Sequence, residues 1–227
     1  MPLPAGLPVP SVIRHVFYLH GFASGAKSTK AGYFAGRLEE RGVQLTSPDF
    51  NEPDFTTLTI TRMLDRLGHE LARAGDEPVA VIGSSLGGAL AVLAAGRFAT
   101  RIDRLVLLAP AVGFAKPGHH LLPRGRIEEW RRLGAMPFFH YAYNADRPLN
   151  FAFYEDSLAY DPFTAVIDQP TIVFQGLRDA SVDHQTVEAF ARTRPNVTLF
   201  LLDDDHQLIA SLPRIWEGVA PFLGLPD

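Results

Sequence analysis

Residues 79–88 read VAVIGSSLGG, a β-branched run that leads into the pentapeptide GSSLG at 83–87. Sequence rich in Ala and Leu follows, so the pattern predicts a buried parallel strand, a sharp turn and then a helix. The Gly-x-Ser-x-Gly spacing is that of a nucleophile elbow, because glycine permits the close backbone approach that such a turn requires. The turn would place the Ser85 hydroxyl at a helix N-terminus, where free N–H groups stabilise negative charge. The alternative is a glycine-rich turn with a structural serine.

Strand-like and helix-like segments alternate along the chain on both sides of this motif. Short apolar runs predict strands over 15–19, 43–45, 79–82, 105–109, 171–175 and 197–202. Apolar residues at helical spacing predict helices over 28–40, 60–71, 86–98, after Asp183 and over 208–222. Strands that alternate with helices form parallel sheets, so we expect an α/β fold with a doubly wound, mostly parallel sheet of about six strands.

The composition is that of one globular domain over residues 1–227. Hydrophobic residues make up 47% of the chain and charged residues 20%, and the net charge of -4 provides no basic surface for nucleic acid. Apolar runs fall short of the roughly 18 residues that span a bilayer, and the proline-rich start lacks the pattern of a signal peptide. We therefore expect a cytoplasmic protein with an extended arm over 1–12. Because the chain has no cysteine, disulfides and thiolate metal sites are excluded.

Residues 111–163 differ from the regions on either side. They are rich in proline, glycine and aromatic residues, include a predicted helix over 127–133, and separate two predicted core strands. An insertion at the C-terminal edge of a parallel sheet covers the crevice where ligands bind, so we expect a lid. The candidates for lining an apolar acyl pocket beneath it are Phe138, Phe139, Tyr141 and Tyr143. Alternatively, these rings form a small core of their own.

Ser85 needs a base to take its proton, because a serine hydroxyl is a poor nucleophile at neutral pH. His206 follows the last predicted strand and Asp179 follows the strand before it, so both would lie at the same sheet edge as Ser85. The chain order Ser, Asp, His is that of the α/β-hydrolase design, and we interpret the three residues as a catalytic triad. Asp183 is the rival acid, but its position before an apolar helix favours an N-cap.

Two backbone N–H groups are expected to bind the oxyanion of a tetrahedral intermediate. One belongs to Leu86, the residue after the nucleophile, and the other to Phe22, in the loop after the first predicted strand. His20 ends that strand, where a structural role in shaping the oxyanion loop is favoured over a catalytic one.

The remaining charged residues near these motifs are interpreted as solvated. The acidic run 203–205 is expected to form a turn that adds negative charge near His206. Lys27 and Lys30 are expected on a solvated loop and helix face, with contact to an anionic substrate as the alternative. No His, Asp or Glu cluster has the spacing of metal ligands, so we expect neither metal nor cofactor.

The motifs together resemble those of a known family. Residues 18–24 read YLHGFAS, are followed by Ser28 and Lys30, and resemble the oxyanion loop of the small YqiA-like esterases within the α/β-hydrolase superfamily. GSSLGG at 83–88 resembles their nucleophile motif, and QGLRD at 175–179 and Asp205-His206 are similar to their acid and histidine motifs. The likeness extends from His15 over nearly the whole chain, although 111–163 is longer and more aromatic than in the smallest members.

This resemblance implies that Ser85, Asp179 and His206 form the triad of an esterase for short acyl esters or thioesters. The residues themselves predict acyl transfer, and we expect a serine hydrolase that cleaves a small-molecule carboxylic ester through an acyl-enzyme. A thioesterase, an acyltransferase or a perhydrolase could use the same three residues. A non-catalytic binding protein on this fold is the remaining alternative.

Overall fold

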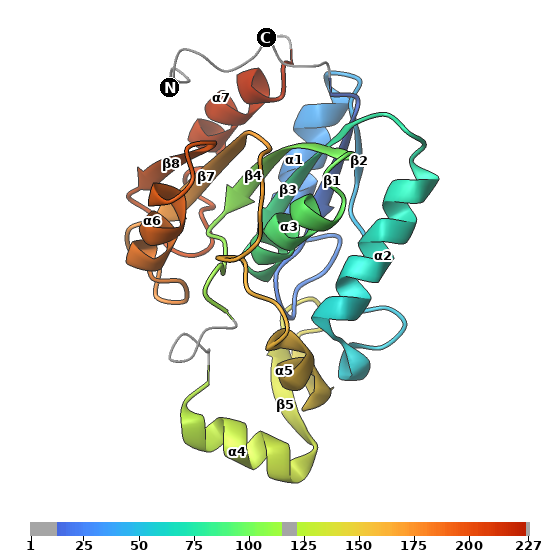
Figure 1. Ribbon diagram of the computed structural model, residues 1–227, viewed down its shortest axis with the longest axis vertical. Coiled ribbons are helices and arrows are strands. Elements are labelled where there is room, and N and C mark those ends of the chain that lie inside the picture. Colours follow the sequence, from blue (N-terminus) through green and yellow to red (C-terminus); the bar gives the residue numbers. More distant parts are fainter. Residues whose placement is uncertain (1–12, 115–121, 226–227) are drawn as a thin grey trace.

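The computed structural model describes residues 13–114 and 122–225, and its centre is a six-stranded parallel sheet (Figure 1). The extended arm expected over 1–12 lies outside the described residues. In spatial order the strands are β2 (Gln44–Thr46), β1 (His15–Leu19), β3 (Val79–Ser84), β4 (Ile102–Leu108), β7 (Thr171–Gly176) and β8 (Val197–Leu202). The predicted α/β fold with a sheet of six strands is confirmed.

The strand order reverses between β1 and β3. From β1 the chain moves outward to β2, returns to β3, and then continues through β4 and β7 to the opposite edge at β8. In open parallel sheets the crevice at such a reversal, outside the carboxyl ends of the strands, is where ligands bind. Ser85 follows β3 and Phe22 follows β1, so the topology places the predicted nucleophile and oxyanion loop on the two sides of this crevice.

Helices cover both faces of the sheet because successive strand residues point to opposite faces. In β1, Val16 and Tyr18 belong to one apolar core and Phe17 and Leu19 to the other. The first core includes α1 (Thr29–Glu39) and α7 (Leu212–Phe222). The second includes α2 (Ile60–Arg73), α3 (Leu86–Arg97), α6 (His184–Arg192) and, before α2, the 3-10 helix η1 (Phe55–Thr57).

Predicted helix boundaries are confirmed at most ends, with one clear exception. The side chains of Ser28 and Asp183 cap α1 and α6 as expected. The last helix was expected from residue 208 but begins at Leu212. Leu208 has a φ of 55°, a left-handed conformation that cannot continue a right-handed helix.

The region between β4 and β7 contains elements outside the central sheet, at the end of the molecule opposite α7 (Figure 1). Its described part contains α4 (Arg124–Leu133), an antiparallel hairpin of β5 (Ala135–His140) and β6 (Ala145–Asn150), and α5 (Ala152–Ser157). The sequence did not predict the hairpin, because Pro137 and Pro148 argue against strands. The two prolines face each other in a ribbon of two strands, each of which has an open edge that tolerates proline.

None of the helices in the two described segments is long and apolar enough to cross a membrane.

Candidate active site

Ser85 occupies a strained turn between β3 and α3. Its φ of 55° and ψ of -119° lie in a region that residues with a side chain rarely adopt. The neighbouring glycines make the turn possible, since a Cβ on Gly83 would lie 2.3 Å from Gly87 O, and one on Gly87 would lie 2.0 Å from Leu19 O. The backbone is therefore packed too tightly for any other residue at either position, and Ser85 projects from the sheet edge at the start of α3.

The structure brings together the three residues expected to form the triad. His206 Nε2 lies 3.1 Å from Ser85 Oγ, and His206 Nδ1 lies 2.7 Å from Asp179 Oδ2. The Asp179 carboxylate can only accept a hydrogen bond, so the proton of a neutral His206 is assigned to Nδ1. His206 Nε2 is then free to accept a hydrogen bond from the serine hydroxyl. This is the arrangement in which an imidazole can remove a proton from serine.

Asp179 is held by four hydrogen bonds. Its Oδ1 accepts from the backbone N–H groups of Ser181 and Val182, each at 2.8 Å, and its Oδ2 accepts from His206 and from Gln175 Nε2 at 3.0 Å. Burial would raise the pKa of Asp179, but the hydrogen bonds from His206, Val182 and Ser181 outweigh it and lower that pKa from its ordinary value. Asp179 therefore remains an anion that faces His206.

Gln175 supports the Asp179 carboxylate, a contact that the sequence did not reveal. It is fully buried at the end of β7, and its amide also donates to the carbonyls of Gly176 and Val182. A polar residue among apolar ones in a strand buried on both faces was the available signal.

The loops that carry Asp179 and His206 are joined directly. Arg178 N donates to Asp204 O at 3.0 Å, and a Cβ on Gly176 would lie 2.5 Å from that same carbonyl oxygen. Asp204 itself is buried and accepts from Ser211 N before α7, so the expectation that all of 203–205 is solvated is wrong at this position. Asp203 is exposed and pairs with Arg178. A short polar side chain can act as a cap as readily as it forms a turn, which is why the sequence did not separate these cases.

Asp183 does not take part in the triad geometry. Its carboxylate accepts from Gln185 N at 3.0 Å and caps α6, as its sequence context indicated.

The expected oxyanion groups flank Ser85. Leu86 is the first residue of α3, so its N–H has no partner within the helix. On the other side, Gly21 packs against the nucleophile, where a Cβ would lie 3.2 Å from Ser85 Cβ.

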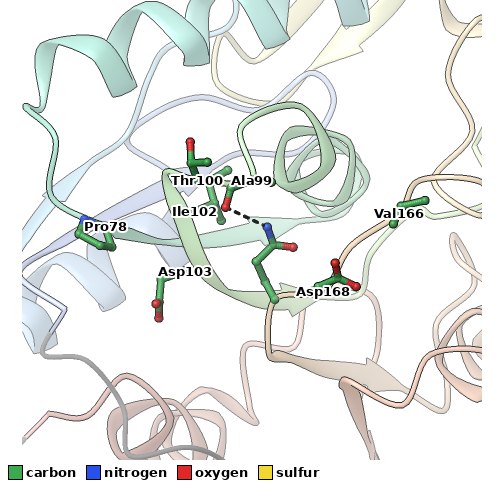
Figure 2. A pocket seen from close by; sticks show the side chains of 8 residues that line it. Pro78, Ala99, Thr100, Ile102, Asp103, Val166 and Asp168 are labelled. Atoms are coloured by element: carbon green, nitrogen blue, oxygen red, sulfur yellow. Dashed lines mark hydrogen bonds between the residues drawn. The ribbon is translucent and has the colours of Figure 1, made fainter.

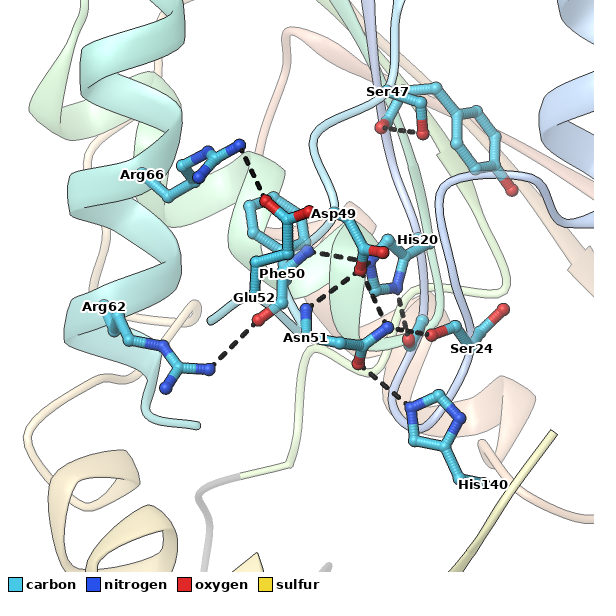
Figure 3. A network of polar contacts seen from close by, with 12 residues as sticks. His20, Ser24, Ser47, Asp49, Phe50, Asn51, Glu52, Arg62, Arg66 and His140 are labelled. Carbon is cyan, nitrogen blue, oxygen red and sulfur yellow. Dashed lines mark hydrogen bonds and ion pairs between the residues drawn. The ribbon is translucent and has the colours of Figure 1, made fainter. Parts of the chain in front are cut away.

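His20 holds the peptide that joins Gly21 to Phe22. Phe50 N donates to His20 Nε2 at 3.1 Å, which leaves the proton on Nδ1 to donate to Gly21 O at 2.9 Å (Figure 3). In a planar trans peptide the N–H points away from the carbonyl, so fixing Gly21 O also fixes the direction of the Phe22 N–H. His20 is buried, as expected of a residue that shapes the loop.

A polar network joins this loop to the β5–β6 hairpin. Asn51 Nδ2 donates to Ser24 O at 2.8 Å, and Asn51 Oδ1 lies 3.0 Å from His140 Nε2 (Figure 3). Burial lowers the pKa of His140, so the ring is neutral and donates from Nε2. Tyr141 N adds a bond of 2.8 Å to Ala23 O. The hairpin is thus tied to the oxyanion loop at two successive carbonyls.

A cavity of about 1180 Å³ opens next to Ser85 and His206. Its apolar wall comes mainly from the region between β4 and β7, with Phe22 added from the oxyanion loop. The rings are mutually packed, with centroids 5.5 Å apart for Phe22 and Phe138 and 5.0 Å apart for Trp130 and Phe138. The large apolar residues of this wall include Phe22, Ile127, Trp130, Phe138, Phe153 and Tyr154.

Two of the four expected pocket residues line this cavity and two do not. Phe138 and Tyr141 are among the lining residues, whereas Phe139 and Tyr143 are not. Phe138 and Phe139 are adjacent in β5 and therefore point to opposite faces, which leaves Phe139 half exposed. Tyr143 stacks on His140 at the hairpin turn. The sequence did not separate Phe138 from Phe139 because β5 was not predicted.

Lys30 is not solvated as expected. It is buried in the first turn of α1, lines the cavity, and donates from Nζ to Gln207 O at 3.1 Å. Lys27 is exposed, as predicted.

A second cavity of about 370 Å³ lies at the opposite end of the strands (Figure 2). Pro78, Ile102 and Gln169 line it, close to where β3, β4 and β7 begin, and it includes none of the triad residues. No group of three or more His, Asp or Glu side chains able to hold a metal ion occurs within 13–114 and 122–225.

The fold and the Ser-His-Asp arrangement define the α/β-hydrolase class. The chain belongs to the uncharacterised protein family UPF0227, whose model matches residues 15–220, and this agrees with the resemblance to the YqiA-like esterases. No curated protein sequence matches the chain.

Solved structures share this fold at low sequence identity. Mouse alpha/beta hydrolase domain-containing protein 10 is 18% identical with a TM-score of 0.77, over 92% of this chain and 89% of that chain. Est1E from Butyrivibrio proteoclasticus is 19% identical with a TM-score of 0.73, over 95% and 88%. A monoacylglycerol lipase from Paleococcus ferrophilus is 12% identical with a TM-score of 0.74, over 94% and 96%. At such identities the likeness establishes the fold alone.

Proposed function

We propose that the protein is a serine hydrolase that cleaves carboxylic esters of small molecules through an acyl-enzyme. The observation that carries the proposal is the continuous hydrogen-bonded chain from Asp179 through His206 to Ser85. Its protonation pattern suits general-base catalysis, because a neutral imidazole presents Nε2 to the serine hydroxyl while an anion fixes Nδ1.

In the first half of the reaction, Ser85 Oγ attacks the ester carbonyl carbon as His206 Nε2 takes its proton. The N–H groups of Leu86 and Phe22 bind the oxyanion of the tetrahedral intermediate. The bond to the leaving alcohol then breaks, and the imidazolium gives its proton to that oxygen. In the second half, water attacks the acyl-enzyme by the same proton path, which releases the carboxylic acid and restores Ser85.

The region over 111–163 is proposed to act as a lid over this centre. Its described part supplies most of the apolar cavity wall beside Ser85, a surface suited to an acyl chain rather than a charged group. Each methylene buried there would contribute about 0.8 kcal/mol, so small or medium acyl chains are the proposed substrates. The packing of Trp130 against Phe138 and Phe151 also supports the alternative of a local core, and one set of rings can serve both roles.

The decisive experiment combines covalent labelling with one substitution. We expect a fluorophosphonate to label the wild-type protein at Ser85, and Ser85→Ala to remove labelling and lower hydrolysis of p-nitrophenyl acetate by about 10³-fold or more. The melting temperature should be nearly unchanged, because only a hydroxyl is removed. Ser84→Ala is the matched control, since this neighbouring serine is buried at the end of β3 and takes no part in the hydrogen-bonded chain from Asp179 to Ser85, so labelling should stay intact.

Activity of Ser85→Ala close to that of wild type would reject the proposal, as would a wild-type protein that neither labels nor hydrolyses any ester. Oxygen and sulfur esters of one acyl chain, compared at equal concentration, separate an esterase from a thioesterase. Transfer of the acyl group to an added alcohol or to peroxide would instead indicate an acyltransferase or a perhydrolase.

A further inference from the structure

Lys30 is a buried cation for which the triad reaction as described has no role. It is 7% exposed, and its Nζ donates to the carbonyl of Gln207, the residue that follows His206. This bond joins α1 to the loop after β8, two segments separated by 177 positions in the sequence. Lys30 therefore restrains the backbone next to the histidine.

The charges around Lys30 are mostly negative. Asp179 and Asp205 interact with it most strongly, and Asp204 adds to them. Arg178 is turned outward and pairs with exposed Asp203. These carboxylates lie on the two loops that also carry the triad acid and histidine.

Further titratable groups that line the cavity with Lys30 include Tyr18, Asp183 and the exposed Lys27. Burial raises the pKa of Tyr18 to about 12, so its hydroxyl is neutral. Asp183 lines the same cavity while it caps α6. His206 can act as the base only while its imidazole is neutral.

We propose that Lys30 is a positioning residue for His206: its ammonium group holds the loop through Gln207 O, and its positive charge offsets the negative charge of the carboxylates on the two loops that carry Asp179 and His206. The proposal rests on the proposed function of Ser85, His206 and Asp179. It adds a fourth side chain, supplied by α1, to the machinery built from the carboxyl ends of β3, β7 and β8.

The position of Lys30 is unfavourable for the fold, which supports a role in activity. A cation in the first turn of a helix faces the positive end of the helix dipole. Burial lowers the pKa of Lys30 to about 8, although the charges of Asp179, Asp205 and Asp204 raise it. Lys30 is therefore charged below that pH, and its amine is increasingly neutral above it.

The test is the pH profile of kcat/KM between pH 5.5 and 9.5 for wild type, Lys30→Met, Lys30→Gln and Lys30→Arg. Lys30→Met removes both the charge and the hydrogen bond, Lys30→Gln keeps a donor without the charge, and Lys30→Arg keeps both. In Lys30→Met and Lys30→Gln we expect the acid limb of the kcat/KM profile to move up by about one pH unit. Their kcat/KM should then fall roughly tenfold at pH 6 and recover by pH 9. Arg should keep the wild-type limb.

A control and a stability measurement separate positioning from structural support. Arg37→Met removes a positive charge from the same helix, outside the cavity, and should leave the acid limb in place. Lys30→Met should melt at the same or a higher temperature than wild type, because an unfavourably buried charge is gone. A purely structural lysine would give lower stability and a loss of activity that is equal at every pH.

Either of two results would overturn the inference: an acid limb that stays in place in both Met and Gln variants, or a loss of activity that does not depend on pH. If the Lys30→Met protein does not fold, Lys30→Gln answers the same question. Ser85→Ala, measured in parallel, distinguishes a failure of the proposed function from a failure of the role proposed for Lys30. If Ser85→Ala is inactive and the lysine variants are unaffected, the proposed function stands and only the role of Lys30 is wrong.

Discussion

The sheet edge that carries Ser85, Asp179 and His206 and the region between β4 and β7 form the two sides of one cavity, but they are built differently. At the sheet edge, backbone packs on backbone, with Gly87 against Leu19 O and Gly176 against Asp204 O. In the region between β4 and β7, side chains pack on side chains, as in the cluster of Trp130 with Phe138, Phe151 and Tyr154.

This difference determines how much each side tolerates change. Backbone contacts at van der Waals distance leave no rotamer that could relieve an added atom, so the geometry of the triad is imposed by the fold. A layer of aromatic side chains can repack when one ring changes, at a modest cost in stability. Under the proposed function, a rigid edge with the reacting groups opposite an adaptable wall would suit an enzyme whose chemistry is constant while its acyl group varies.

The largest contrast is expected from adding one methyl group on each side. Gly87→Ala places a Cβ 2.0 Å from Leu19 O, so β1 or α3 must shift. We expect a loss of over about 3 kcal/mol, little folded protein and almost no hydrolysis. Gly125→Ala, in α4, meets no atom within 4 Å and should stabilise the helix by about 0.5–1 kcal/mol. Melting temperatures measure both, and a Gly87→Ala protein that folds and works normally would contradict this account.

The next contrast lies within the sheet edge, between two aspartates four positions apart. Asp179→Asn should lower kcat by about 10⁴-fold, because an amide in place of the carboxylate no longer favours the Nδ1–H tautomer of His206. Asp183→Asn should change neither activity nor stability appreciably, since Asn caps a helix about as well as Asp. Steady-state kinetics and thermal melts test the pair. Loss of activity in the Asp183 variant instead would make that residue the acid.

The features tested by these two contrasts are mostly ones that the sequence could predict. The β3–α3 elbow, Asp179 and His206 could be placed from sequence because strand, turn and helix signals are local, and parallel strands end at one edge. The cap formed by Asp183 was predictable for the same reason. Such features depend on neighbours in the chain.

The features that the sequence did not reveal depend on residues far away in the chain. The buried Lys30 bonds to Gln207, and buried Asp204 takes its role from Ser211 at the start of the last helix. Pro137 and Pro148 made β5 and β6 look unlike strands, and the two prolines are tolerated only because they lie opposite each other in a hairpin of two strands. Propensity could not indicate any of these, because a lysine, an aspartate and a proline are each more common on surfaces.

The smallest contrast tests the adaptable wall itself, through two adjacent rings of β5. Phe138 lines the cavity and packs on Phe22 and Trp130, whereas Phe139 is 48% exposed and faces away. The cavity of about 1180 Å³ already has room for an octanoyl chain, so Phe138→Ala removes apolar contact rather than relieving crowding. We expect the ratio of kcat/KM for p-nitrophenyl octanoate over acetate to fall about three- to tenfold in Phe138→Ala and to stay unchanged in Phe139→Ala.

Phe151→Ala is the control for lost packing in this contrast. Phe151 is buried and stacks on Tyr154 and against Trp130, but it does not line the cavity. Phe151→Ala should lower the free energy of unfolding by about 3 kcal/mol, and with it the melting temperature, as Phe138→Ala does. It should leave the octanoate-to-acetate ratio of kcat/KM unchanged. If both variants change that ratio equally, Phe138 acts only by supporting the local core, and the acyl chain must be recognised elsewhere in the cavity. A change confined to Phe138→Ala means that the acyl chain contacts this ring, so that acyl length is read by the wall opposite the triad.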